Sequence, residues 1–399
     1  MRGLSTIERD AIARAGDAPM LAQVEAWAAI NSGTRNLPGL ATMATTLADA
    51  FAVLPGALTL VAPAAAEAVA TDGVVSALDH GQHLHLSVRP EAPVRMLFTG
   101  HMDTVYPVDH PFQTLQTMDD GTVNGPGVAD MKGGLAVMLA ALQAVEASGA
   151  AIGYDVVINS DEETGSFSSA ALLAQAARGK IAALTYEPAL ADGTLAGARG
   201  GTGNFSIVVE GRSAHAGRNP EDGRNAVVAA ADIAVRLAKV AGPKLAVNPA
   251  RIDGGGPNNV VPDRAVLRVN FRPATLDDIE SARAHIDAVV ALVAVEHDVR
   301  VSVYGGFNRP PKPIDAGAAR LFDLVRASGS DLGLNIAWKA TGGVCDGNNI
   351  AAAGVPVVDT MGVRGGAIHS VDEFLIPDSL AERAALSAVT ILRIAEGRL

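Results

Sequence analysis

From about residue 90 onward, short apolar segments alternate with helical segments, and this alternation limits the folds that the chain can adopt. Residues 94–100, 154–159 and 182–186 are predicted strands, and residues 131–147 and 167–177 are predicted helices between them. Strands that alternate with helices along a chain form a mostly parallel sheet with helices on both faces. The sequence therefore predicts an α/β domain.

The pattern changes near Arg199, where segments with alternating apolar and polar residues replace the continuously apolar strands. Such alternation is typical of antiparallel strands with one solvated face. Two long helical segments lie among these strands, which predicts an antiparallel α+β unit with two helices on one sheet. Its predicted strands are residues 205–210, 266–271 and 300–304, and its predicted helices are residues 221–240 and 276–295.

The chain returns to alternating helices and strands after the proline-rich residues 307–313. A helix at 317–328, a strand at 355–360 and a closing helix at 378–396 are predicted there. The simplest architecture is one α/β domain that is interrupted by an insertion. We predict that the discontinuous α/β domain comprises residues 1–198 and 309–399, and that the inserted α+β domain comprises residues 199–308.

Composition and charge argue against some classes of partner. Lys and Arg number 31 and Asp and Glu number 43, so the net charge is −12, and no basic block is present in the sequence. Acidic chains of this kind are poor ligands for nucleic acids and anionic membranes. The N-terminal residues lack the apolar core of a signal peptide, and the apolar residues 51–65 are too short to span a bilayer, so we interpret them as core. The single cysteine, Cys345, fits a reducing compartment, which predicts a cytoplasmic protein.

Acidic residues and histidines follow the predicted strands or precede a helix. Each has an ordinary explanation when taken alone: Asp130 suits a helix N-cap, and Ser160 with Glu163 suits a capping box. Ligands of open α/β sheets, however, bind at the carboxyl ends of the strands. Two histidines and three carboxylates that converge there suit two divalent metal ions with one bridging carboxylate. The residues concerned are His101, Asp130, Glu163, Glu187 and His369.

Five sequence blocks resemble the signature segments of the M20 metallopeptidases, which are co-catalytic zinc carboxypeptidases and amidohydrolases. The blocks read HMDTV, GPGVADMKGG, SDEETGS, YEP and GGAIHSVDE, and they begin at residues 101, 125, 160, 186 and 365. They occur in the family's order over nearly the whole chain. Their spacing is most similar to that of the glutamate carboxypeptidase (carboxypeptidase G2-like) branch. The resemblance implies a zinc-peptidase-like catalytic domain with a mostly parallel central sheet.

The resemblance implies two Zn²⁺ ions per subunit, with Co²⁺ or Mn²⁺ as other possible metals. It implies that Asp130 bridges the ions, that His101 and Glu187 complete one site, and that Glu163 and His369 complete the other. Two further residues receive catalytic roles in the same way. Asp103 is expected to orient His101, and Glu162 is expected to act as the general base toward a metal-activated water. The peptide bond between residues 130 and 131 is expected to be cis.

For the inserted domain, the resemblance implies a ferredoxin-like dimerisation domain and a homodimer. His215 is expected to reach the partner's active site as an oxyanion donor, and Asn259 is expected to contact substrate. Arg272 is expected to bind the substrate carboxylate, because a guanidinium matches a carboxylate geometrically. Asn270 stands where relatives usually carry Asp, which puts the orientation of Arg272 in question. Arg309 is a second candidate for the carboxylate.

The glycine-rich residues 341–348 resemble a family segment before the final strand, which implies a substrate contact for Gly343. Cys345 replaces the family's usual hydroxyl residue. We favour a conservative exchange there, and the alternative is a thiol that senses oxidants or metal. His83 and His85 alternate on a predicted strand, have no carboxylate block nearby in the sequence, and match no family ligand, so we predict that they do not bind metal.

These observations predict a dizinc hydrolase that cleaves an amide bond next to a free carboxylate and releases a glutamate-like C-terminal amino acid. The predicted substrate is a small anionic peptide or N-acyl amino acid. An N-acyl-amino-acid deacylase of the acetylornithine or succinyl-diaminopimelate type is the alternative. A catalytically inactive binding protein on the same frame is disfavoured, because Glu162 and all five ligand positions are intact.

Overall fold

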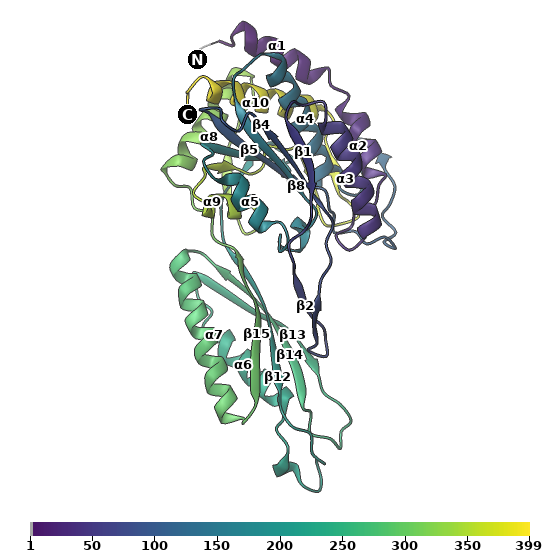
Figure 1. Ribbon diagram of the computed structural model, residues 1–399, viewed down its shortest axis with the longest axis vertical. Helices are drawn as coiled ribbons and strands as arrows, with labels where there is room; N and C mark the ends of the chain where they lie inside the picture. Colours follow the sequence, from purple (N-terminus) through teal and green to yellow (C-terminus); the bar gives the residue numbers. More distant parts are fainter. Residues whose placement is uncertain (1–2) are drawn as a thin grey trace.

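A six-stranded, mostly parallel sheet forms the centre of the α/β domain in the computed structural model, which describes residues 3–399 (Figure 1). The strand order is β1-β4-β8-β5-β9-β17. The last four strands in this order are parallel to one another, whereas β4 is antiparallel to both of its neighbours. The α/β prediction is confirmed. The strands are β1 (Ala57–Val61), β4 (His83–Val88), β5 (Arg95–His101), β8 (Gly153–Asn159), β9 (Ala182–Thr185) and β17 (Val357–Val358).

Helices cover both faces of this sheet because successive side chains of its buried strands point to opposite faces. On β5, Met96 and Phe98 belong to a large core, whereas Leu97 belongs to a separate core on the other face. The smaller core contains α5 (Ala170–Ala177) and α9 (Asp346–Ala352). The large core contains α1 (Thr6–Gly16), α2 (Met20–Ala28), α3 (Leu37–Phe51), α4 (Gly134–Ala147), α8 (Ala316–Asp331) and α10 (Asp378–Ala395).

The most apolar helical segment lies inside this core. Residues 128–147 are long and apolar enough to cross a membrane by length and composition, but 94% of the tested window is buried within the protein. It therefore packs as a core segment. The sequence interpretation of residues 51–65 was wrong in part. Phe51 and Leu54 are buried, but β1 is an edge strand whose residues are half-buried or exposed.

The inserted domain is a four-stranded antiparallel sheet with the order β13-β14-β12-β15. Two helices pack on one face, and the chain order of strands and helices is βαββαβ, which is the ferredoxin-like arrangement. The predicted α+β unit is confirmed. Its elements are β12 (Thr202–Glu210), α6 (Ala226–Ala238), β13 (Leu245–Gly254), β14 (Arg264–Pro273), α7 (Leu276–Glu296) and β15 (Arg300–Arg309).

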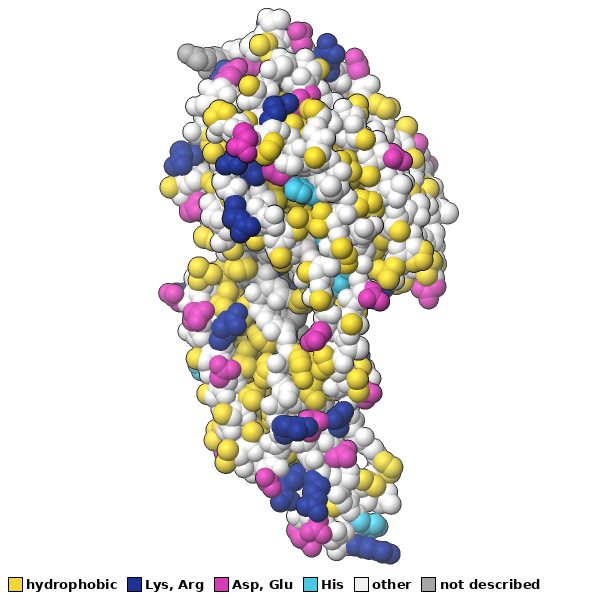
Figure 2. Space-filling model, viewed as in Figure 1, with side chains coloured by type: hydrophobic (Ala, Val, Ile, Leu, Met, Phe, Trp, Pro, Cys, Tyr) yellow, Lys and Arg dark blue, Asp and Glu magenta, His cyan; other side chains and the backbone are white. Residues whose placement is uncertain are grey.

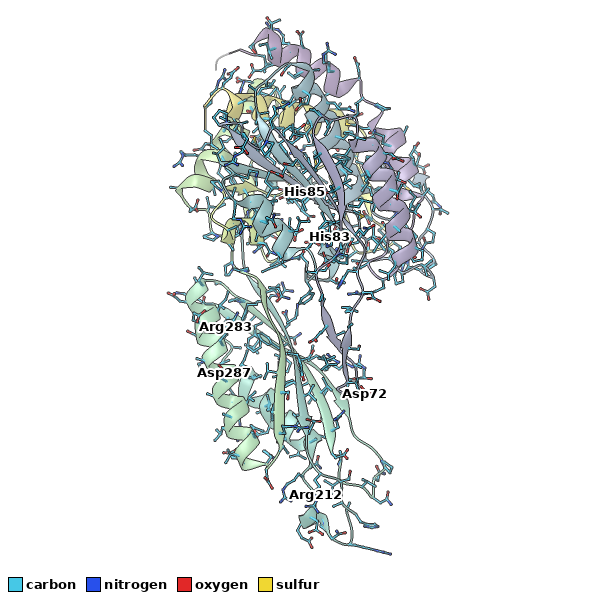
Figure 3. The ribbon with its side chains drawn as sticks, in the orientation of Figure 1. Asp72, His83, His85, Arg212, Arg283 and Asp287 are labelled. Carbon is cyan, nitrogen blue, oxygen red and sulfur yellow. The ribbon has the colours of Figure 1, made fainter. Side chains whose placement is uncertain are left out.

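A long hairpin that the sequence analysis did not predict connects the two domains. Strands β2 (Glu67–Val69) and β3 (Val75–Ala77) lie between β1 and β4 in the chain, yet they reach the sheet of the inserted domain (Figure 1). Asp72, near the hairpin tip, lies beside that sheet (Figure 3), and its carbonyl accepts a hydrogen bond from Arg264. The hairpin thus spans the gap between the domains.

Two kinds of contact hold the hairpin on the open face of the inserted sheet. Arg268 Nη2 donates to the carbonyl oxygens of Val69 and Ala70 at 2.6 and 3.0 Å. Gly73 has a φ of 80°, and a Cβ added to it would lie 3.0 Å from Val208 Cγ1. Since a side chain would be strained there, glycine permits the close approach.

Two small β-structures surround the predicted site. One is a parallel ribbon of β11 (Leu195–Arg199) and β16 (Trp338–Thr341). The other is a five-stranded sheet of β10 (Ala189–Leu190), β18 (Arg364–Gly366), β19 (Phe374–Leu375), β7 (Val123–Asn124) and β6 (Gln116–Thr117).

Several predicted boundaries differ from the structure. The helix predicted from residue 221 begins at Ala226, because the Asn225 side chain accepts hydrogen bonds from the backbone of residues 227 and 228 and caps the helix there. The helix predicted from residue 131 begins at Gly134, after a cis peptide bond between Asp130 and Met131 that agrees with the expectation.

The charged side chains on the face drawn in Figure 2 are mixed in sign. Lys and Arg side chains are interspersed with Asp and Glu rather than gathered in one basic patch. This distribution agrees with the acidic composition and gives that face no extended positive potential.

We predict that Arg268→Ala loosens the hairpin. The substitution removes two hydrogen bonds to the carbonyls of residues 69 and 70 without altering either core. Amide hydrogen exchange of residues 67–77 should become faster, while exchange in β5 and β8 should stay unchanged. Arg251→Ala is the matched control, because Arg251 is exposed on the neighbouring strand and contacts Asp253. Equal hairpin exchange in both variants would contradict the prediction.

Candidate metal centre

Neighbouring parallel strands bring the predicted metal ligands to one edge of the central sheet. His101 is the last residue of β5, Glu163 follows β8 in the short turn Glu162–Thr164, and Glu187 follows β9. Because β8, β5 and β9 are adjacent and parallel, their carboxyl ends meet at the same edge. Asp130 lies in the turn before α4, and His369 lies in the loop after β18.

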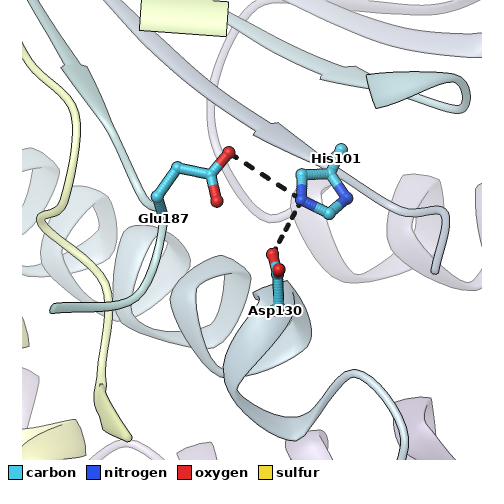
Figure 4. A group of neighbouring side chains, drawn as sticks. All are labelled: His101, Asp130 and Glu187. Carbon is cyan, nitrogen blue, oxygen red and sulfur yellow. Dashed lines mark hydrogen bonds and ion pairs between the residues drawn. The ribbon is translucent and has the colours of Figure 1, made fainter. Parts of the chain in front are cut away.

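His101, Asp130 and Glu187 form one group of potential ligands (Figure 4). His101 Nε2 is 3.0 Å from Asp130 Oδ1 and 3.9 Å from Glu187 Oε1. One ligand atom from each of the three residues lies within 4.8 Å of the others.

Asp130, Glu163 and His369 form a second group with the same compactness. His369 Nε2 is 3.1 Å from Glu163 Oε2 and 3.3 Å from Asp130 Oδ2. The two oxygens of Asp130 therefore face different histidines. A carboxylate placed in this way can bridge two cations, and the set of two imidazoles and three carboxylates fits divalent ions of the zinc type.

Burial and mutual repulsion govern the protonation of these carboxyl groups. Burial, together with the charge of Asp130, raises the pKa of Glu163 to about 8 and raises the pKa of Glu187 well above its usual range. Burial opposes ionisation of Asp130 as well, but hydrogen bonds with His101 and His369 lower its pKa below the usual range. Two cations in this space offset the repulsion among the carboxylates, so the electrostatics also fit a metal centre.

Asp103 contacts both His101 and the turn that carries Glu162 and Glu163. His101 Nδ1 is 3.0 Å from the Asp103 carbonyl and 3.4 Å from its carboxylate, which leaves Nε2 directed at the ligand groups. The Asp103 carboxylate also accepts hydrogen bonds from the backbone N–H groups of Glu162 and Glu163, both at 3.2 Å. The geometry supports the expected orienting role and adds a second one, because Asp103 also fixes the turn that carries both glutamates.

Glu162 is buried beside the ligand groups and contacts Arg309. Arg309 Nη2 is 2.7 Å from Glu162 Oε1 and donates to the Glu162 carbonyl at 2.8 Å. Burial raises the pKa of Glu162 to about 7, although the positive charge of Arg309 acts in the opposite direction. The sequence analysis considered Arg309 for a substrate carboxylate, but the structure pairs it with Glu162 and Asp346.

Glu373 is a buried residue to which the sequence analysis gave no role. Its Oε1 accepts hydrogen bonds from the backbone N–H groups of Ala129 and Asp130, each at 3.0 Å. Its Oε2 accepts from Gly127 N at 3.2 Å and from the Tyr106 hydroxyl at 2.9 Å. Glu373 therefore connects the loop that carries His369 to the loop that carries Asp130. Its place in the GGAIHSVDE block was the only signal for it in the sequence.

Three predicted substrate contacts belong neither to the two ligand groups nor to the lining of the cavity beside them. His215 and Asn259 are both exposed and adjacent, since Ala216 N donates to the Asn259 carbonyl. They belong to the far end of the inserted domain, near the labelled Arg212 in Figure 3. Arg272 is also exposed, and its Nε donates to Asn270 Oδ1 at 2.9 Å. Within one subunit, therefore, these side chains are not brought to the ligand groups.

A cavity of about 270 Å³ opens from the ligand groups toward the ribbon of β11 and β16. Gly343 lines it, as does Cys345. The Cys345 thiol is buried and caps α9, where its sulfur accepts from Gly347 N at 3.3 Å. Burial raises the pKa of this thiol well above its usual range, and a buried neutral thiol is chemically inert. This supports the conservative exchange, which stays a prediction.

His83 and His85 lie outside the centre. Neither belongs to a group of three potential metal ligands within residues 3–399, and the expectation that they bind no metal stays a prediction. In the folded protein His85 contacts a single carboxylate, since its Nε2 is 2.7 Å from Asp155 Oδ1 on β8. Sequence separation hid this contact, because β4 and β8 are neighbours only in the folded sheet.

An α/β domain with this ligand cluster at its strand ends, interrupted by a βαββαβ domain, defines a metal-dependent hydrolase of the two-domain peptidase class. The sequence profile of peptidase family M20/M25/M40 matches residues 97–393, and the chain belongs to this family.

Curated relatives and solved structures agree with this assignment. The chain is 29% identical to carboxypeptidase G2 of Pseudomonas sp. (strain RS-16) over 329 residues, which cover 80% of this chain and 78% of the relative. It is 28% identical to succinyl-diaminopimelate desuccinylase of Janthinobacterium sp. (strain Marseille), with 70% and 78% covered. The fold matches the M20 family metallo-carboxypeptidase Sso-CP2 from Sulfolobus solfataricus with a TM-score of 0.70, at 14% identity over 95% of this chain and 99% of that one.

We predict that Glu373→Gln weakens metal binding about 10- to 100-fold, as is usual for residues that hold metal ligands in place. A glutamine keeps only one acceptor oxygen, and its NH₂ group would face backbone donors of the Asp130 loop or the Tyr106 hydroxyl. Competition with a chelator measures the affinity. Asp372→Asn is the control, because it removes a charge from the same loop at an exposed position. Unchanged affinity in a folded Glu373→Gln protein would contradict the prediction.

Proposed function

We propose that the protein is a dizinc hydrolase that cleaves an amide or peptide bond next to a free carboxylate and releases a glutamate-like C-terminal amino acid. The observation that carries this proposal is the shared position of Asp130 between two ligand groups, with Glu162 buried beside both. We assign His101 and Glu187 to one ion and Glu163 and His369 to the other. Zn²⁺ is the proposed metal, and Co²⁺ or Mn²⁺ are chemically compatible with the same ligands.

When bound, ions of this kind lower the pKa of a water molecule and polarise the substrate carbonyl. The residues of the chain supply the proton transfer. A carboxyl group with a pKa of about 7 can both accept a proton from the attacking water and return it to the leaving nitrogen near neutral pH. Arg309 holds Glu162 in place through one contact to its carboxylate and one to its carbonyl. Burial of the Glu162 side chain limits the access of bulk water to that proton.

The proposed enzyme works as a homodimer. His215 and Asn259 are exposed on the inserted domain and not near the ligand groups of their own subunit. We propose that they enter the partner's active site, where His215 donates a hydrogen bond to the developing oxyanion. Arg272 is the proposed ligand of the free carboxylate of the substrate. Gly343 lines the cavity and is a proposed backbone contact for substrate.

An N-acyl-amino-acid deacylase is the second candidate. Succinyl-diaminopimelate desuccinylases stand beside carboxypeptidase G2 among the relatives at nearly the same identity. Both candidates use the same metal ligands and the same general base, and they differ in which side of the bond is recognised. A screen of the zinc-loaded protein with N-acyl glutamates, p-aminobenzoyl glutamates, dipeptides and succinyl or acetyl diamino acids separates them.

We predict that Glu162→Gln retains about two zinc ions per chain and loses turnover by about a hundredfold to ten-thousandfold, which is the usual contribution of a general base. The amide keeps the shape of the side chain but cannot accept the proton. Elemental analysis measures the metal, and steady-state kinetics measure kcat. Near-normal kcat would remove Glu162 from the mechanism, and absence of zinc from carefully loaded wild-type protein would contradict the metal centre.

We predict that inactive variants complement each other across the dimer. His215→Ala alone should lose about a hundredfold in kcat, as is typical for loss of an oxyanion donor. After exchange with an equal amount of Glu162→Gln subunits, half of the dimers are mixed, and each mixed dimer has both groups intact in one of its two sites. About a quarter of wild-type activity should therefore return. Mass-tagged subunits verify the exchange. Full activity of His215→Ala, or no recovery in mixed dimers, would contradict the proposed role.

A further inference from the structure

The cavity beside the metal centre has a wall that catalysis itself does not require. One end is formed by the ligand residues, and the other end is formed by the ribbon of β11 and β16 and the turn before it. All of its lining residues belong to the α/β domain except Arg199, the last residue of β11 at the predicted domain boundary, so the cavity forms within one subunit. A substrate whose scissile bond lies at the metal centre must place one of its arms there.

Most of the cavity wall is apolar. The apolar contributors surround the path between the metal centre and the ribbon, where they exclude water from a bound chain. They are Pro188, Leu190, Leu195, Ala196, Val344 and Ile368.

The ribbon places a lysine at the far end of this apolar path. Residues two apart on a strand share a face, and Lys339 and Thr341 of β16 both line the cavity. Trp338, the first residue of β16, faces the opposite side and packs on Phe322 of α8, with ring centroids 4.9 Å apart. The fixed direction of β16 therefore aims Lys339 at the cavity.

Lys339 carries a charge that the protein does not pair. Among residues 3–399, no carboxylate lies within ion-pair distance of its ammonium group. A hydrogen bond from Thr194 and the charge of Lys339 lower the pKa of Asp192, which lies in the exposed turn before β11. The Asp192 carboxylate is not paired with Lys339 and accepts this hydrogen bond from Thr194 N at 2.9 Å within that turn. The ammonium group is thus free to bind an anion in the cavity.

The buried side of the cavity wall adds to the positive charge, because Arg199 lines the cavity and Lys312 lies behind it. Arg199 binds Asp359 through Nε at 2.7 Å and Nη2 at 3.3 Å, and Lys312 Nζ lies 3.1 Å from the same carboxylate. Within the described residues, Asp359 is the only acid within 4.0 Å of either cation. Two buried cations share one carboxylate, which leaves one positive charge on this side of the cavity. Little screening occurs in such a buried layer, so its field reaches the cavity.

We propose that this cavity is a subsite for a substrate arm with a short apolar stem and a terminal carboxylate, and that Lys339 is the specificity-determining residue that binds this carboxylate. The assignment rests on the proposed function, because it takes the metal centre as the position of the scissile bond. It adds to that function the residue that recognises the substrate's second carboxylate, which is distinct from the one assigned to Arg272. The carboxylate can belong to the leaving amino acid or to the acyl group, since both are arms of the same bond.

Two matched substrate series test the subsite and identify the arm. In the first, the acyl group is acetyl and the amino acid is glutamate, its isosteric amide glutamine, or lysine. In the second, the amino acid is alanine and the acyl group is succinyl, its monoamide, or β-alanyl. We expect a preference of about tenfold or more in kcat/KM for acid over amide in one series, as a charged hydrogen bond supplies.

Charge reversal at residue 339 provides the decisive comparison. Lys339→Glu should abolish the preference for acid over amide and raise the relative kcat/KM of the cationic member of the same series. Lys339→Gln should bring the acid-to-amide ratio of kcat/KM close to one. Lys244→Glu is the matched control, because it makes the same charge change at an exposed position of the inserted domain and should leave the ratio unchanged. An acid-to-amide ratio near one in both wild-type series, or one that Lys339→Glu does not alter, would overturn the proposal.

A binding measurement keeps the two proposals separable. Titration calorimetry of the zinc-loaded protein compares the affinities of glutarate and its monoamide without turnover. Each compound has one carboxylate for the metal centre, and the two differ only in the group that would reach the subsite. Tighter binding of glutarate that Lys339→Glu removes would uphold the subsite even if no amide in the series were hydrolysed, and only the proposed function would then fail. Equal binding of both compounds would overturn the subsite, whatever the hydrolytic activity.

Discussion

Repulsion among buried carboxylates is the constraint on which the architecture of the active domain depends. Asp130, Glu162, Glu163 and Glu187 share one space at the carboxyl ends of neighbouring strands, and burial resists the ionisation of each. A fold that placed these groups together without compensation would be strongly destabilised. The two histidines and the cations that the cluster fits supply the compensation. The apolar cores on both faces of the sheet make the strands rigid enough to hold the groups against their repulsion.

A layer of hydrogen bonds behind the ligands converts this crowding into a defined geometry. The Asp103 carboxylate accepts hydrogen bonds from backbone N–H groups of the Glu162 turn, and the Glu373 carboxylate accepts them from backbone N–H groups of the Asp130 loop. Both are buried carboxylates that accept N–H donors, so each loop is fixed by a charge-assisted contact. Arg309 performs the corresponding task for Glu162 itself. The turn of Glu162 and Glu163 and the loop of Asp130 are therefore each held by a buried residue outside the two ligand groups.

Local patterns in the sequence predicted the parts of this design that local interactions determine. The continuous apolar run of β5, in which Leu97 faces one core and Phe98 the other, is visible in the sequence because each face of the sheet buries its own apolar side chains. The ligands could be found because motifs mark them at strand ends. The contact of Arg309 with Glu162 joins residues 147 positions apart, and that of Glu373 with Asp130 joins residues 243 apart. Periodicity carries no information on such pairs, which explains why these contacts were not predicted.

The hairpin of β2 and β3 shows the same limit on a larger scale. Its strands are short and largely exposed, and the residue that holds it, Arg268, lies 199 positions from Val69. Nothing in the segment itself indicates where it binds, because the stabilising donors belong to another domain. The fold of the inserted domain could likewise be predicted from its own sequence, whereas the contacts of its exposed His215 and Asn259 depend on groups outside that domain.

Selectivity and catalysis are divided between the two domains in a way that follows from these placements. The proposed metal ligands, Glu162 and the cavity that ends at Lys339 lie on the α/β domain, so in our proposals the same domain recognises a substrate arm and positions the bond. The groups assigned to the oxyanion and the terminal carboxylate lie on the inserted domain and must arrive by assembly or domain movement. Changes in the cavity should therefore alter which substrate is chosen, whereas changes in the hairpin or the inserted domain should alter how often a bound substrate reacts. The hairpin, which belongs to the α/β domain and binds the inserted sheet, connects the two domains in addition to the two chain crossings near residues 199 and 309.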